Sequence, residues 1–210
     1  MRLLKFQSVF EIPVELAVDD IELRTPIVDD FEDWLALRTA SAKFLQPWEP
    51  TWDPADTRRS TFRQRIKRYH ADLKSGKSIS LFIFIDNDKH PAAAKILVGG
   101  ITIANIRRGV SQSCTIGYWM GEAYAGRGIM GKTVRRIIPY IFDDLKLHRI
   151  EAAAIETNAP SISLLNKCGF KFEGKVRKYL KIHGKWQDHR LYSFLSDDPR
   201  PTEGVSTGSK

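Results

Sequence analysis

A short glycine-rich loop precedes a long amphipathic helix, and it constrains the fold more than any other part of the chain. Gly126, Gly128 and Gly131 lie within residues 125–132, AGRGIMGK. Glycine adopts backbone conformations that other residues avoid, and the first N–H groups of a helix lack partners within that helix. The apolar residues that follow have helical spacing and form one stripe: Met130, Val134, Ile137, Ile138, Ile141, Phe142 and Leu145. The sequence therefore predicts an exposed anion-binding loop above a packed helix.

The chain before this loop has the pattern of an antiparallel meander. Apolar and β-branched stretches predict strands at residues 21–24, 78–85, 95–106 and 113–120. Gly99 and Gly100 in the third of these indicate a bulge or a bend. Helices are predicted at residues 29–39 and 56–74, separated by a rigid loop with three prolines. The last three strands are joined by short polar connections, which favour antiparallel pairing.

Helices and strands alternate after the loop. We expect a helix to about residue 145, a strand at 148–156, a helix at 160–167, and strands at 170–180 and 190–195. Pro139 lies inside the first helix, where a proline costs roughly 3 kcal/mol. We therefore expect a kink or an early helix end there.

These elements fit one domain with two tails. We expect an extension at residues 1–18, a domain at 19–196 and a flexible tail at 197–210. The chain has no uninterrupted apolar run of about 18 residues and no signal-like start, so we expect a cytoplasmic protein with no membrane association. Cys114 and Cys168 stand in no Cys/His grouping, so no metal site is expected, and both should be reduced and buried.

The net charge of +8 suits an acidic partner, either a polyphosphate cofactor or a nucleic-acid-rich assembly. The densest cationic segment alternates with apolar residues at helical spacing, which is typical of the solvated face of a surface helix. Its cations are Arg58, Arg59, Arg63, Arg65, Lys67 and Arg68.

Residues 126–133 also satisfy the P-loop pattern GxxxxGK[ST], in which backbone amides and a lysine hold nucleotide phosphates. A P-loop enzyme needs a following strand that ends in a magnesium-binding aspartate. The segment at 137–144 ends in Asp143 and Asp144, but it lies on the helical stripe and contains Pro139, which a central strand does not tolerate. The pattern is therefore weak support for a nucleotide triphosphatase.

Three segments in order resemble the GNAT acetyltransferase superfamily: the strand at 115–120, the loop at 125–131, and the block from 158–161 to 167–170. The resemblance covers residues 21–195. It implies an α/β (α+β) fold with a mixed, mostly antiparallel central sheet, splayed at the cofactor site and flanked by helices. It also implies acetyl-CoA as co-substrate, with the loop amides on its diphosphate and no metal.

Shorter motifs narrow the resemblance to the RimJ/RimL group, the ribosomal-protein N-terminal alanine and serine acetyltransferases. They lie at residues 116–119, 126–130, 148–150, 169–174 and 179–189. This implies an acceptor protein N-terminus, ribosomal in origin, with nucleic acid involved only indirectly. Acetylation of a small amine, such as a polyamine, amino acid or antibiotic, and a non-catalytic CoA- or RNA-binding module are the alternatives. The sequence leaves monomer or homodimer open.

The resemblance also implies site residues. Ser161 would protonate the leaving thiolate and Glu173 would act through water as the base, whereas the structural alternatives are a helix start for Ser161 and a surface carboxylate for Glu173. Leu165 stands where many GNAT enzymes carry a tyrosine proton donor, and Ala125 and Met130 depart from the usual loop. The implied cofactor-binding residues are Tyr118, Trp119, Met120, Gly126, Arg127, Gly128, Ile129, Met130, Gly131, Lys132 and Asn158, the last with a helix cap as its alternative.

Overall fold

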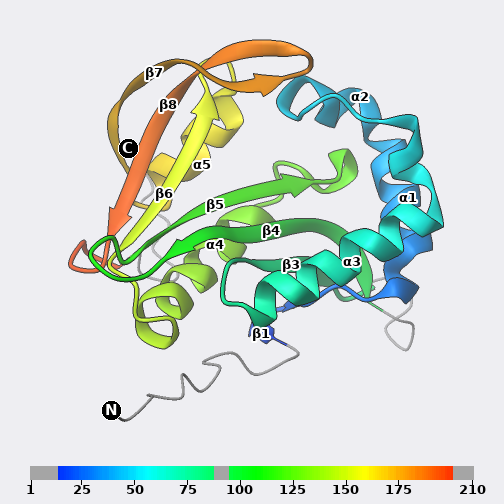
Figure 1. Cartoon of the computed structure of the whole chain (residues 1–210), viewed down its shortest axis with the longest axis horizontal. Coiled ribbons are helices and arrows are strands. Elements are labelled where there is room, and N and C mark those ends of the chain that lie inside the picture. The colour runs from blue at the N-terminus through cyan, green and yellow to red at the C-terminus, as the bar shows by residue number, and fades with distance from the viewer. Residues whose placement is uncertain (1–13, 88–94, 201–210) are drawn as a thin grey trace, which may run out of the picture.

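The computed structural model describes residues 14–87 and 95–200, in which eight strands form one sheet with helices on both faces. Figure 1 shows α1 and α3 on one face and α4 and α5 on the other. The strand order is β1-β2-β3-β4-β5-β6-β8-β7. Neighbouring strands are antiparallel except for β5 and β6, which are parallel. The predicted fold class, a mixed and mostly antiparallel sheet flanked by helices, is confirmed.

The elements follow the predicted order. The strands are β1 (Glu15–Val18), β2 (Ile21–Arg24), β3 (Ile79–Ile85), β4 (Ile96–Arg107), β5 (Ser113–Met120), β6 (Arg149–Ile155), β7 (Lys171–Ile182) and β8 (Lys185–Leu195). The helices are α1 (Phe31–Ala40), α2 (Ala42–Leu45), α3 (Arg59–Lys74), α4 (Ile129–Pro139) and α5 (Ala159–Lys167), with short 3-10 helices at Val28–Asp30, Gln46–Trp48, Pro54–Thr57 and Glu122–Tyr124.

The predicted meander of β3, β4 and β5 is confirmed, and so is the irregularity at the glycine pair. Ile83 lies opposite Gly99 and Phe84 opposite Leu97, so the register shifts by one residue beside Gly99. The expected proline-rich loop instead contains short 3-10 turns, because proline fits the first positions of a helix.

Pro139 ends α4, as the sequence indicated. Proline has no N–H to continue the helical ladder, and the chain goes on as a π-helical turn, Tyr140–Asp144, closed by a bond from the Leu145 N–H to the Tyr140 carbonyl. The apolar stripe continues through this turn, since Ile141, Phe142 and Leu145 are buried.

β7 and β8 form a hairpin that is longer than predicted. β8 begins at Lys185 rather than near residue 190, because charged residues interrupt the apolar alternation there. The Asp188 carboxylate accepts the Lys178 N–H at 2.9 Å and stabilises a register shift in β7, where Lys178 has a φ of +49°. At the hairpin tip the His183 N–H donates to the Glu49 carbonyl at 2.8 Å, which joins the hairpin to the segment after α2 (Figure 1).

Both ends of the expected domain differ from the sequence boundaries. β1 lies within the expected extension and pairs with β2, so the sheet includes part of that segment. At the other end, Asp198 binds Lys171, and Arg200 forms an ion pair with Asp143 at 2.9 Å, so this part of the expected tail lies against the domain. Residues 1–13 and 201–210 lie outside the described ranges.

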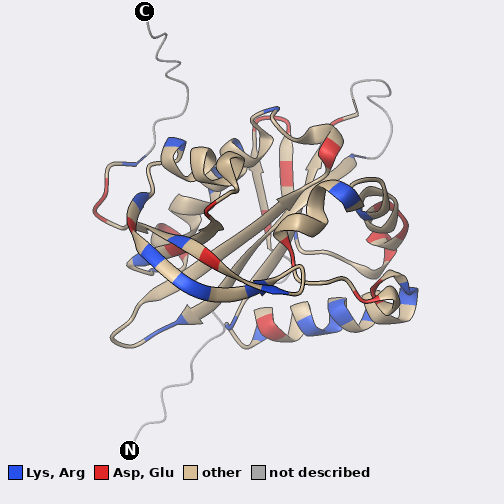
Figure 2. Cartoon of the chain, turned by 90° about the horizontal axis from the view of Figure 1, so that it is seen from above, with Lys and Arg blue, Asp and Glu red and all other residues tan. Residues whose placement is uncertain are grey.

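Two apolar cores flank the sheet. The larger lies under α4 and α5, and the smaller joins α1 and α3 to the opposite face through Phe31, Trp34, Phe62 and Ile66. The basic segment is confirmed as a surface helix, since α3 buries its apolar stripe, and Figure 2 shows Lys and Arg along this helix. Both cysteines are buried and free, as expected.

Candidate active site

The sheet divides between β5 and β6. Their pairing ends where Thr115 lies opposite Glu151. Beyond this point β5 stays paired with β4 and β6 with β8, and the two strands diverge (Figure 1). The separated edge of β5 presents backbone N–H and C=O groups, which suits an extended ligand that carries amides.

The glycine loop lies beyond the diverging end of β5. Gly126 has a φ of +75° and Gly128 a φ of +81°, and a Cβ atom at either position would meet no atom within 4 Å. Gly128 is the N-cap of α4 and no side chain caps the helix. The loop residues Gly126, Arg127 and Gly128 are exposed, whereas the Ile129 and Met130 side chains are buried, so the last two offer a ligand their backbone groups. This open helix N-terminus fits the diphosphate predicted for it.

Two cations flank the loop. The Lys132 ammonium lies 2.8 Å from the Asp19 carboxylate and 3.7 Å from that of Asp20, in the turn between β1 and β2. The Arg127 guanidinium lies 5.7 Å from the centre of the Tyr124 ring. Lys132 is therefore partly neutralised by the protein itself, and its contact with a phosphate stays a prediction, like that of Arg127.

Tyr118 and Trp119 point to opposite faces of the sheet, as successive strand residues do. The Trp119 ring packs edge-on against Phe82 and lies 5.0 Å from the Arg38 guanidinium, on the face of α1. Tyr118 and Met120 pack against the core on the face of α4 and α5. Cofactor contacts at 118–120 would therefore involve the backbone edge of β5 and the Tyr118 side chain, and they stay a prediction.

A hydroxyl pair spans the divergence. The Tyr118 phenol oxygen and the Ser161 hydroxyl oxygen lie 2.8 Å apart, one on β5 and the other at the start of α5. Burial raises the pKa of Tyr118 to about 12, so its phenol remains protonated and able to donate at neutral pH. The sequence indicated Ser161 but not Tyr118 as a proton source. The available signal was the alternation along β5, which places Tyr118 on the same face as the apolar residues Cys114 and Ile116.

Asn158 and Leu165, two further residues considered in the sequence, both have structural roles. The Asn158 side-chain oxygen accepts the Ser161 N–H at 3.1 Å and caps α5, which is the structural role weighed against cofactor contact. Leu165 is completely buried, so the place of the usual tyrosine is filled by core.

Glu173 lies in a separate ionic network. Both of its carboxylate oxygens bind the Arg149 guanidinium, and the Ser193 hydroxyl donates to one of them at 2.7 Å. Arg149 lies at the start of β6, whereas Ser161 follows its end, and no contact in residues 14–87 and 95–200 joins Glu173 to the hydroxyl pair. The structure therefore does not bring the two predicted catalytic residues together, and a base role for Glu173 stays a prediction.

The same network predicts an acid-dependent stability. The hydrogen bond from Arg149 holds the pKa of the Glu173 carboxylate below its ordinary value. The folded state therefore binds fewer protons than the unfolded state near this pKa, and the ion pair stops stabilising the fold as the pH falls below about 4.5. Replacing Glu173 with glutamine should lower the Tm at pH 7, and the Tm difference from wild type should shrink toward pH 3. A difference that stays constant over this range in thermal denaturation would contradict the ion pair.

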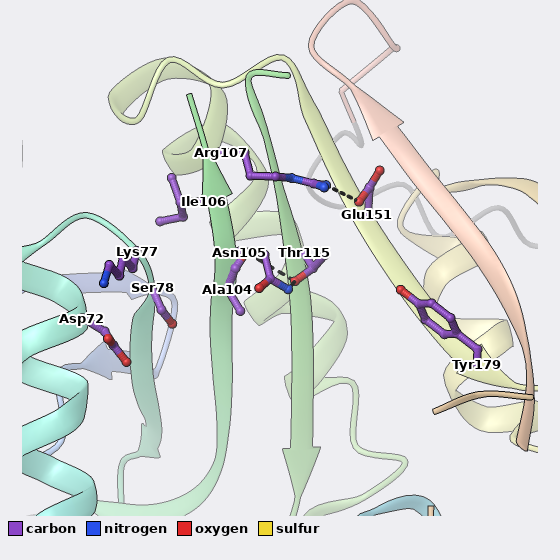
Figure 3. A pocket seen from close by; sticks show the side chains of 10 residues that line it. All are labelled: Asp72, Lys77, Ser78, Ala104, Asn105, Ile106, Arg107, Thr115, Glu151 and Tyr179. Atoms are coloured by element: carbon purple, nitrogen blue, oxygen red, sulfur yellow. Dashed lines mark hydrogen bonds and ion pairs between the residues drawn. The ribbon is translucent and has the colours of Figure 1, made fainter. Parts of the chain in front are cut away.

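A cavity of about 580 Å³ lies on the face of α3, where the β5–β6 pairing ends (Figure 3). Its walls come from α3 and the turn after it, β4, β5, β6 and β7. They are Asp72, Lys77, Ser78, Ala104, Asn105, Ile106, Arg107, Thr115, Glu151 and Tyr179. Glu151 binds Arg107 and Arg149, each at 2.9 Å. Glu151 was not predicted from the sequence, although the polar residues at 149 and 151 alternate with buried residues of β6 and so indicate an open face.

Two negative findings apply to the described ranges. No group of three or more His, Cys, Asp or Glu side chains could hold a metal ion. No helix there is long and apolar enough to cross a bilayer.

Comparison with known proteins points to one family. A model described as an acetyltransferase (GNAT) domain matches residues 20–171. Probable N-acetyltransferase YjcK of Bacillus subtilis is 34% identical over 178 residues, which is 85% of this chain and 95% of the relative. The ribosomal protein uS5 alanine N-acetyltransferase of Escherichia coli is 30% identical over 190 residues, 90% of this chain and 94% of that protein. The structure of Mycobacterium smegmatis RimJ in complex with CoA-disulfide has a TM-score of 0.78 at 28% identity and covers 88% of this chain and 87% of its own.

Proposed function

Because this chain belongs to the GNAT acetyltransferase family and is an acetyl-CoA-dependent N-acetyltransferase, we propose that its acceptor is the N-terminal α-amino group of a ribosomal protein. The similarity to relatives named for acetylation of ribosomal proteins extends over nine tenths of the chain and supports this acceptor class. A ribosomal acceptor also implies work in the cytoplasm.

The observation that carries the proposal is that the two glutamates described above are bound by arginines. Glu151 and Glu173 both bind arginines, and the pKa of Glu173 is lowered, so Glu173 is a weak base. An α-amine has a pKa near 8 and a lysine amine near 10.4, so at pH 7 the uncharged fraction of the α-amine is roughly 200-fold larger. A site whose candidate base is weak therefore favours an acceptor that loses its proton easily.

Each step of acetyl transfer can be assigned to a part of the site. Acetyl-CoA supplies a thioester carbon, and the uncharged amine nitrogen forms its bond to that carbon while the carbon–sulfur bond breaks. The nitrogen then gives up its extra proton to water, which leaves a neutral amide. Backbone N–H groups on the separated edge of β5 would stabilise the oxygen that gains negative charge. The Tyr118–Ser161 pair would donate a proton to the departing sulfur. The cavity beside Glu151 would hold the first residues of the acceptor.

Three matched peptides test the proposal. The first begins with alanine and has no lysine, the second has the same sequence with a blocked N-terminus, and the third is the blocked peptide with one internal lysine. Release of free thiol from acetyl-CoA should be at least tenfold faster with the first peptide than with either blocked one. Faster turnover of the lysine peptide, or of spermidine or a free amino acid, would overturn the assigned acceptor class.

A further inference from the structure

Exposed apolar side chains gather on the β7–β8 hairpin. Of the six large hydrophobic side chains that are exposed in the described part of the chain, four lie there: Phe172, Tyr179, Leu180 and Trp186. Trp186 is 60% exposed. An exposed tryptophan in a group of apolar side chains is uncommon on a surface that meets only water.

The same hairpin carries cations that form no salt bridge with any described residue, although the charge of one of them, Arg177, acts on the Asp188 carboxylate. Within residues 14–87 and 95–200, no salt bridge involves Arg177, Lys178, Lys181 or Lys185. By contrast, Lys175 on the same hairpin pairs with Glu156 and Asp188. Figure 2 shows Lys and Arg along this hairpin. Lys181 lies opposite Trp186 in the hairpin, so these two side chains share one face, and Leu180 and Lys185 lie on the other. The four cations, with Tyr179, Leu180 and Trp186, surround the end of the hairpin and are called the hairpin patch below.

Two simpler explanations cover only part of the patch. β7 is an edge strand, and lysines on an edge strand prevent pairing with other chains. That accounts for Lys178 and Lys181 but not for Trp186, which lies on β8 and is exposed. A two-fold contact with a second copy would bury the apolar groups, yet it would also place four cations against four cations. The surface therefore fits a ligand that is both anionic and rich in flat apolar faces.

We propose that the hairpin patch binds single-stranded RNA. Phosphates would complement the four cations, and an unpaired base would stack on Trp186, since sequence-tolerant RNA contacts combine a cationic surface with aromatic platforms. Tyr179 belongs to both the patch and the acceptor cavity. RNA bound there would therefore lie beside the acceptor terminus, a consequence that rests on the proposed function, whereas RNA binding itself does not.

Fluorescence anisotropy with a labelled 12-nucleotide single-stranded RNA tests the proposal. The affinity should fall with salt, with a slope of log K against log salt near roughly −3, as expected for about four phosphate contacts. Replacing Lys181 and Lys185 together with glutamate should weaken binding at least tenfold at low salt. Trp186→Ala should weaken it about fivefold or more through lost stacking. The matched control replaces Arg63 and Lys67, two exposed cations of α3 without salt bridges in the described ranges, with glutamate.

The control should bind RNA within twofold of wild type. Equal losses in both charge variants would overturn the proposal, because binding would then depend on net charge alone. Binding of a 12-residue polyglutamate as tightly as RNA would also overturn it, in favour of an acidic protein partner. Peptide acetylation by the Lys181/Lys185 variant should match wild type. If no peptide is acetylated while RNA binds as expected, the proposed function fails and the RNA site stands.

Discussion

Replacing Ser161 with alanine or Tyr118 with phenylalanine should lower kcat for acetyl transfer by about 10²-fold, the low end of the usual contribution of a positioned proton donor. Each change removes one hydroxyl of the 2.8 Å pair that joins β5 to the start of α5. If the two hydroxyls act as one relay, the kcat of the double variant should be no more than about tenfold below that of the slower single variant. The reason is that the effects of removing groups that act as a unit do not add. Turnover at saturating acetyl-CoA and peptide measures this.

Tyr140→Phe is the matched control for the tyrosine change. Burial raises the pKa of Tyr140 to about 12 as well, but it lies in the π-helical turn after α4 and outside the site. Its kcat should stay near that of wild type. All variants should keep the thermal stabilisation by acetyl-CoA, since a lost proton donor affects the chemical step and not binding. Unchanged kcat in both single variants would assign the thiolate proton to another source.

The sequence was sufficient for the features that depend on local pattern. The glycine loop, the apolar stripe of α4 and the strand at 113–120 each follow from neighbouring residues. Pro139 marked the end of α4 because its effect acts on its own helix. Antiparallel pairing of β3, β4 and β5 followed from short connections. The mixed sheet implied by the resemblance is present, with β5 and β6 as its parallel pair.

Features that depend on distant contacts were not predictable in the same way. Tyr118 and Ser161 are 43 residues apart, and nothing near either one indicates their hydrogen bond. Glu173 and Arg149 lie 24 residues apart, so the sequence could suggest a base but could not show the guanidinium that neutralises it. The predicted strands of the β7–β8 hairpin were shorter than the observed ones, because lysines interrupt the alternation of apolar and polar residues. Backbone pairing nevertheless tolerates lysines on an exposed edge.

Gly99 illustrates a position where a single methyl group should have a large effect. A Cβ atom there would lie 2.5 Å from the backbone oxygen of Trp119 and 3.3 Å from the Cα of Met120. These are backbone atoms of β5, so the steric clash can be relieved only if β4 and β5 move apart. We expect Gly99→Ala to cost about 2 kcal/mol of stability, within the usual range for overpacking. This corresponds to a Tm decrease of roughly 4–8 °C for a domain of this size.

Gly117→Ala on the neighbouring strand is the matched control. A Cβ atom at Gly117 would meet nothing within 4 Å, so its Tm should change by less than about 2 °C. Gly99→Ala should also weaken acetyl-CoA binding in a titration, because it displaces the end of β5 on which the co-substrate is proposed to lie. If Gly99→Ala melts like Gly117→Ala, the bulge beside Gly99 absorbs the methyl group, and the close approach of β4 and β5 does not require glycine. A lowered Tm with unchanged acetyl-CoA affinity would instead separate the packing of β5 from its binding edge.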